Sequence, residues 1–219
     1  MSVSHPYGLS RRVNRAVLTV TLAFGGAAFV TLAVLAFATG ARGFTAASLV
    51  YGGSLAVCAL CSFLYQMLET VRWRDLLRYL DHSAIFLLIA GTYTPFAAAG
   101  IHGPFNGSLL AWVWGLALVG IVLKLVLPRA HDRAFVLVYL AMGWIFVTSA
   151  GEVFHNIPAL PLVFLALGGA AYTVGALIFA RDIGRWTDPV WHGCVLAGIV
   201  AHFLAVITFC LSPEMVALV

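Results

Sequence analysis

Residues 16–38 read AVLTVTLAFGGAAFVTLAVLAFA, and this stretch contains no charged side chain. A helix of about 20 apolar residues is long enough to cross the hydrocarbon core of a bilayer. Comparable apolar stretches recur near 46–68, 80–99, 108–127, 134–151, 160–180 and 189–211. The sequence therefore predicts an all-α, seven-transmembrane helix bundle, with residues 1–219 forming a single membrane domain.

The composition supports a membrane protein. Hydrophobic residues make up 63% of the chain and charged residues only 9%, too few to cover the surface of a water-soluble globule. The stretches lack an alternating barrel pattern, so each is expected to be helical and to satisfy its own backbone amides. The net charge of +4 forms no basic stripe of the kind that binds nucleic acid. Membrane lipids are the expected partners, and nucleic acid is not.

The basic residues are distributed asymmetrically. If all seven stretches cross the membrane, Arg42 lies on one side and the other eleven Lys and Arg residues lie on the opposite side. Those eleven are Arg11, Arg12, Arg15, Arg72, Arg74, Arg78, Lys124, Arg129, Arg133, Arg181 and Arg185. Short loops rich in Lys and Arg stay cytoplasmic. This pattern predicts a cytoplasmic N-terminus and an extracytoplasmic C-terminus.

Polar side chains cluster at the predicted cytoplasmic ends of the second, third and seventh stretches. These ends carry Gln66, Asp81 and Asp188. Asp188 and His192 are four residues apart, which makes them neighbours on one helix face that could share a metal or a proton. Ser62 precedes Gln66 by the same spacing and supplies a hydroxyl one turn deeper. We expect these residues to meet in one pocket.

Local structural roles compete with that pocket. Asp188 precedes Pro189, a pattern typical of a helix N-cap followed by proline at the first helical position. Residues 70–79 read as an interfacial loop, so Asp81 could cap the third helix in the same way. Ser62 could hydrogen-bond to a carbonyl of its own helix.

His202 lies ten residues into the last apolar stretch. At that spacing it is about 15 Å along the helix from His192, too far to bind the same ion. Ionisable side chains at such depth are rare and are usually functional. A neutral imidazole in an interhelical hydrogen bond is the alternative, and we favour it.

Several motifs point to a known family. Residues 80–96, LDHSAIFLLIAGTYTPF, resemble the signature of the bacterial hemolysin III proteins, which are relatives of the adiponectin and progestin receptors. The segments 62–65 (SFLY), 139–144 (YLAMGW), 191–198 (WHGCVLAG) and 202–203 (HF) agree with that family in order and spacing. The resemblance implies a receptor-like bundle of seven helices in the bacterial inner (plasma) membrane.

The resemblance also implies a zinc ion near the cytoplasmic ends of helices two, three and seven. Asp81 and His192 match the family's ligand positions, whereas Gln66 and Asp188 stand where the family has His. An amide oxygen is a poor substitute for imidazole on zinc, so these replacements weaken Zn²⁺ binding. The oxygen-rich set makes harder divalent ions competitive. Alternatively, no metal binds, and Asp188 pairs with protonated His192.

Three functions follow from the resemblance. We favour a noncatalytic, receptor-like role or a role in membrane-lipid homeostasis, with a degenerate metal pocket on the cytoplasmic side. The alternative is a metal-dependent lipid amide hydrolase, in which Asp81 takes a proton from water and Ser62 helps to hold an oxyanion. A cytolytic pore is the second alternative. It ranks last because, apart from His202, the centres of the stretches carry no ionisable group for a conducting path.

Overall fold

The computed structural model describes residues 8–39, 42–68, 72–99, 106–127 and 132–212, and this part of the chain is helical. The α-helices are α1 (Gly8–Thr39), α2 (Arg42–Met67), α3 (Arg74–Ala99), α4 (Asn106–Val126), α5 (Asp132–Gly143), α6 (Ala150–Asn156), α7 (Ala159–Arg181) and α8 (Thr187–Cys210). Two short 3₁₀ helices, η2 (Ile145–Ser149) and η3 (Gly184–Trp186), connect α5 to α6 and α7 to α8. The predicted all-α class is confirmed.

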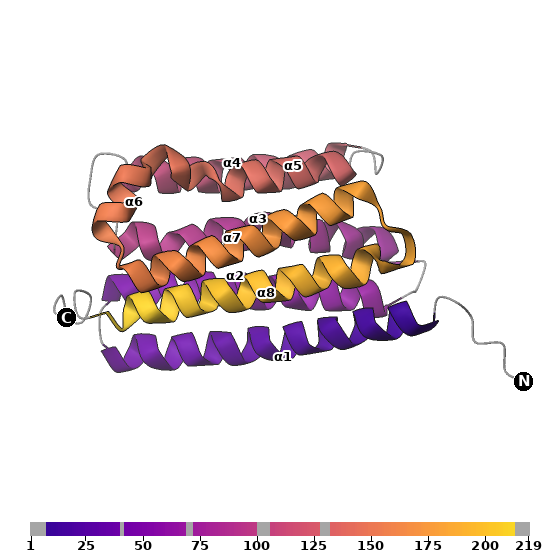
Figure 1. Cartoon of the computed structure of the whole chain (residues 1–219), viewed down its shortest axis with the longest axis horizontal. Helices are drawn as coiled ribbons and strands as arrows, with labels where there is room; N and C mark the ends of the chain where they lie inside the picture. Colours follow the sequence, from indigo (N-terminus) through magenta and orange to yellow (C-terminus); the bar gives the residue numbers. More distant parts are fainter. Residues whose placement is uncertain (1–7, 40–41, 69–71, 100–105, 128–131, 213–219) are drawn as a thin grey trace, which may run out of the picture.

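The long helices run along a common axis and pack side by side (Figure 1). α1 contacts α2, α2 contacts α3, α3 contacts α4, and α7 packs along α8, which returns to α1. The central helix is α3, because it also contacts α5 and α8. The start of α1, the end of α2, the start of α3 and the turn from α7 to α8 lie together at one end of the bundle (Figure 1). We call this the arginine end, because Arg11, Arg15, Arg74 and Arg185 lie there.

Within the described ranges, five helical segments are long and apolar enough to cross a membrane. They span residues 8–38, 46–67, 108–126, 159–181 and 184–210. Large apolar side chains such as Phe37, Trp112 and Val126 are exposed on the outside of the bundle, as expected for a surface that contacts lipid. The predicted stretches 80–99 and 134–151 are not among the five, so seven crossings stay a prediction.

The stretch 134–151, which was expected to be helical, is helical but is not one regular α-helix. α5 ends at Gly143, and the chain continues through η2 into α6. The Tyr93 hydroxyl donates to the carbonyls of Met142 and Gly143 at 3.0 and 2.9 Å and accepts the Phe146 N–H at 3.2 Å. A side chain inserted into the backbone ladder in this way interrupts an α-helix.

The third helix begins earlier than expected, at Arg74. Asp75 lies in its first turn, where a carboxylate interacts favourably with the helix dipole. Leu77, one turn into the helix, is buried against the bundle. The expected loop over 70–79 is therefore wrong from Arg74 onward, and Asp81 lies two turns inside α3, not at its cap.

Small residues allow α7 and α8 to approach closely. A Cβ added to Gly168 would overlap the ring of His202, and one added to Gly198 would lie 2.6 Å from the Tyr172 ring. Glycine at such positions lets neighbouring backbones come together, the usual device in membrane helix pairs. The close approach aligns the face of α8 that carries His192 and His202 with the bundle interior.

Candidate functional site

A hydrogen-bonded amide network joins three helices at the arginine end. The Nδ1 atom of His192 in α8 lies 2.7 Å from Oδ1 of Asn14 in α1. The Nδ2 group of Asn14 donates to Oε1 of Gln66 in α2 at 3.5 Å. An amide oxygen only accepts, so this contact is a hydrogen bond when Nδ1 of His192 carries the proton.

A second polar pair lies one turn deeper. The Ser62 hydroxyl donates to Oδ1 of Asp81, and Asp81 is only 8% exposed. A buried carboxylate is costly unless it is hydrogen-bonded, so Ser62 helps to stabilise Asp81 where it lies. The expectation that Ser62 bonds to its own helix is wrong, since its bond links α2 to α3.

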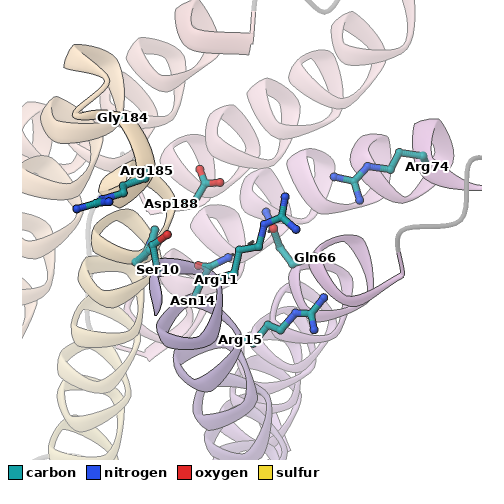
Figure 2. Close-up of a pocket in the computed structure, with 10 residues that line it drawn as sticks. Ser10, Arg11, Asn14, Arg15, Gln66, Arg74, Gly184, Arg185 and Asp188 are labelled. Carbon is teal, nitrogen blue, oxygen red and sulfur yellow. Dashed lines mark hydrogen bonds between the residues drawn. The ribbon is translucent and has the colours of Figure 1, made fainter. Parts of the chain in front are cut away.

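A polar cavity opens at the arginine end above these residues. We call it the vestibule; its volume is about 470 Å³. Its lining includes Arg11, Arg15, Gln66, Arg74, Arg185 and Asp188 (Figure 2). Arginines of α1, α3 and η3 thus line one cavity, and Asp188 provides the one carboxylate among its described lining residues.

An apolar cavity of about 530 Å³ lies within the bundle. Most of its lining is aliphatic or aromatic, with contributions from α2, α3, α5, α6, α7 and α8. Ser62, Asp81 and His192 line it, as does His202, which lies ten residues beyond His192 on α8. The cavity therefore extends for about 15 Å along α8.

The predicted pocket residues divide between the two cavities. Gln66 and Asp188 line the vestibule, whereas Asp81 and His192 line the apolar cavity. The Asn14–His192 hydrogen bond lies at the boundary, because Asn14 lines the vestibule and His192 the apolar cavity. All four lie at the same end of the bundle, but they do not converge on one point.

The expected N-cap role of Asp188 is wrong. α8 begins at Thr187, and no side chain caps it at Trp186. The turn before α8 is instead stabilised by Asp182, whose Oδ1 accepts from the Gly184 N–H at 3.2 Å and from the Thr187 hydroxyl at 3.0 Å. The Asp188 side chain is exposed and lines the vestibule.

The interhelical hydrogen bond predicted for His202 is confirmed. Its Nε2 lies 3.3 Å from the carbonyl oxygen of Leu165 in α7, and its ring meets Tyr172 edge to face with centroids 5.2 Å apart. This contact positions the imidazole at the wall of the apolar cavity.

Sequence reasoning missed Asn14. A lone amide shortly before an apolar stretch carries no motif, and its partners lie 52 and 178 residues away in the chain. The available signal was its depth: Asn14 precedes the apolar core of the first stretch just as Gln66 ends that of the second. Polar residues at matched depth on neighbouring membrane helices often pair.

Comparison with known proteins agrees with the motifs. The family model described as "Haemolysin-III related" matches residues 14–203. The chain belongs to the haemolysin-III related family. Hemolysin-3 of Bacillus cereus is 35% identical over 184 residues, covering 84% of each protein, and the Hemolysin-3 homolog of Bacillus subtilis (strain 168) is 34% identical over 163 residues, covering 74% of this chain and 76% of that protein.

The similarity extends to animal proteins. The human monocyte to macrophage differentiation factor is 25% identical over 169 residues, covering 72% of this chain and 67% of that protein. The predicted membership of the hemolysin III family is thus confirmed. Together with its apolar helices, the match supports a multi-pass membrane protein.

In this haemolysin-III related protein, the side chains that the resemblance assigns to zinc are hydrogen-bonded to other side chains or line different cavities. Nδ1 of His192 and Oε1 of Gln66 are engaged with the Asn14 amide, and Asp81 is engaged with Ser62. Over the described residues, no group of three or more His, Cys, Asp or Glu side chains is placed to hold a metal. Zinc holds its ligands in one tetrahedral shell, whereas Asp81 and His192 line the apolar cavity and Gln66 and Asp188 line the vestibule.

Proposed function

We propose that this haemolysin-III related protein is a noncatalytic, receptor-like membrane protein that holds a single-chain lipid inside its bundle and acts in membrane-lipid homeostasis. The observation that carries the proposal is the apolar cavity of about 530 Å³ with Ser62, Asp81 and His192 in its wall. Its volume is in the range of sites for small organic ligands.

The polar wall residues would select the ligand. A lipid tail gains little by leaving the bilayer for an apolar cavity, because both surroundings are equally apolar. Hydrogen bonds to the polar end of the ligand therefore decide which lipid binds. His192 and the Asp81–Ser62 pair offer ring nitrogen and oxygen atoms for such hydrogen bonds.

The direct test is native mass spectrometry of the purified, delipidated protein with an added single-chain lipid. We expect one lipid per chain, retained after the detergent is stripped. A folded protein that retains no lipid at any concentration below the micellar limit would contradict the proposal.

We further propose seven crossings of the inner membrane, with the N-terminus cytoplasmic and the C-terminus extracytoplasmic. The placement of α3 and of the α5–α6 segment alongside the five membrane-length segments supports the count. The gathering of arginines at one end supports the orientation. A C-terminal reporter that is active in the cytoplasm would contradict it.

The amide network is, in this proposal, a degenerate metal pocket. Elemental analysis of the purified protein should find well under one zinc per chain, because Gln66 replaces an imidazole with an amide. The variant Gln66→His with Asp188→His restores two nitrogen donors and should raise the zinc content. One zinc per chain in the unmodified protein would contradict the degenerate pocket.

A metal-dependent lipid amide hydrolase is the second candidate. It is favoured by the presence of Ser62, Asp81 and His192 in the wall of one cavity of acyl-chain dimensions. Incubation with a lipid amide and divalent metal should release no fatty acid if the noncatalytic proposal holds. Release that disappears in Asp81→Asn would favour the hydrolase.

The relatives named Hemolysin-3 raise a third candidate, a cytolytic pore. A conducting path needs polar side chains through the full depth of the membrane. The interior cavity is instead lined mainly by apolar residues, with Phe96, Ile157 and Leu162 beyond the polar wall. Conductance in liposomes that disappears in His202→Ala would reverse this order.

A further inference from the structure

The vestibule concentrates positive charge. Four arginines, Arg11, Arg15, Arg74 and Arg185, line this cavity, and Asp188 is the one acidic residue among the described residues that line it. Arg11 and Arg15 are four residues apart and so lie on one face of α1. In Figure 2 the side chains of Arg11 and Arg74 extend into the space beside Gln66, whereas Arg185 extends away from it. Arg11 and Arg74 thus bring two guanidinium groups to one space, an arrangement that a bound anion would stabilise.

Arg74 is held in position. Its Nη1 donates to the carbonyl oxygen of Tyr65 at 3.2 Å, and its guanidinium lies over the Tyr65 ring at 4.6 Å from the centroid. A guanidinium has five N–H donors in a planar fork, so this bond leaves others for a ligand. An arginine fixed in this way loses little conformational entropy when it binds an anion.

Membrane topology alone does not explain this arrangement. The positive-inside pattern requires basic residues at the cytoplasmic end, and exposed residues such as Arg12 and Arg181 meet that requirement without lining the cavity. The four arginines that line the vestibule come from three separate elements, and Arg11 of α1 and Arg74 of α3 extend into the same space. A common anionic ligand would account for the convergence of these two side chains.

We propose that the vestibule binds a phosphate monoester or inorganic phosphate. Arginine forks match the oxygens of phosphate in paired hydrogen bonds, and a dianion balances more than one guanidinium. A carboxylate carries a single charge and would leave more of the vestibule unbalanced. The Gln66 amide adds a neutral donor at the same cavity.

The source of the phosphate group follows from the spacing of the two cavities. Gln66 in the vestibule and Ser62 in the apolar cavity are one turn apart on α2, as are Asp188 and His192 on α8. Four residues span about 6 Å along the helix, a distance that a glycerol-sized linker covers. The favoured source is therefore the headgroup of a single-chain lipid phosphate, and this assignment rests on the proposed lipid-holding function.

Three probes distinguish the sources: lysophosphatidic acid, the monoacylglycerol with the same chain, and inorganic phosphate. Binding is measured calorimetrically on the purified full-length protein in a neutral detergent. Arg11→Gln with Arg74→Gln should weaken lysophosphatidic acid about tenfold or more, because charge-assisted hydrogen bonds are lost. Monoacylglycerol should bind this variant as it binds the unmodified protein.

The matched control is Arg12→Gln with Arg181→Gln. It removes the same charge from exposed positions outside the vestibule, and it should change lysophosphatidic acid binding less than about twofold. A third variant has the opposite expected sign: Asp188→Asn should tighten both phosphate probes, because it removes the carboxylate that repels them. This variant keeps the test decisive if the double arginine variant does not fold.

The relative affinities of the three probes show which ligand the vestibule binds. Arginine-dependent binding of lysophosphatidic acid that is tighter than that of inorganic phosphate supports a lipid headgroup. If inorganic phosphate binds as tightly as lysophosphatidic acid and its binding depends on the arginines, the anion site is supported and the lipid source is overturned. Monoacylglycerol that binds while neither phosphate probe depends on the vestibule arginines overturns the anion site and leaves the proposed function standing. Equal losses in both arginine variants, or weaker phosphate binding in Asp188→Asn, also overturn it.

Discussion

The vestibule and the apolar cavity have similar volumes, about 470 and 530 Å³, but opposite linings. The first is walled by arginines and amides, and the second by aliphatic and aromatic side chains with a few polar groups. On both α2 and α8, residues one helical turn apart belong to different cavities. Depth along the helices therefore decides how polar the lining of each cavity is, because positions at headgroup level tolerate charge and deeper positions do not.

Filling the apolar cavity should have the largest effect, because it should greatly weaken lipid binding there and leave the vestibule unchanged. Gly169 lines this cavity, and a Cβ added there would make only an ordinary contact, 3.9 Å from Trp144. The larger side chain of Gly169→Phe would occupy the space of the ligand chain, with an expected loss of about 100-fold in monoacylglycerol binding. Inorganic phosphate binding should be unchanged. Calorimetry with both probes checks this.

The control for that variant is Gly115→Phe in α4, where an added Cβ meets open space. It introduces the same side chain outside either cavity and should leave both probes unaffected. Equal loss of lipid binding in the two variants would show that the apolar cavity is not the lipid site.

Neighbouring glycines in α7 provide the second test. Gly168→Ala places a methyl group where the ring of His202 lies, so the imidazole must move and its bond to Leu165 is strained. We expect a loss of about 1–3 kcal/mol in the free energy of unfolding. Gly169→Ala fits without overlap and should be neutral or stabilising by about 0.5–1 kcal/mol. Thermal unfolding in detergent measures the difference, and equal midpoints would contradict the packing of His202.

The smallest expected effect concerns the boundary between the cavities. Asn14→Ala removes the partner of His192 and Gln66, and should lower the free energy of unfolding by about 1 kcal/mol, the usual size for a membrane hydrogen bond. Thr31→Ala is the control on the same helix, since Thr31 is exposed and bonds only to Ala27 of its own helix. A shift no larger than that of Thr31→Ala would mean that the Asn14 bonds contribute nothing.

Local sequence patterns predicted the membrane helices and several of the polar neighbours. The length of the apolar stretches indicated membrane helices, and the four-residue spacings placed Ser62 beside Gln66 and Asp188 beside His192. The hydrogen bond of His202 was also predictable, because a buried imidazole must find a partner in a neighbouring helix. The break after Gly143 was not, since the Tyr93 hydroxyl that causes it lies about 50 residues earlier in the chain.

The amino-acid sequence by itself determined the class of fold, the family and the end of the bundle that carries positive charge. These properties depend on hydrophobicity, helical period and the distribution of charged residues, all of which act locally along the chain. Only the tertiary structure decided that Asn14 joins Gln66 to His192, that Ser62 supports Asp81, and that arginines from three elements line one cavity. Those relations depend on the rotation and depth of each helix against its neighbours, which interhelical packing sets.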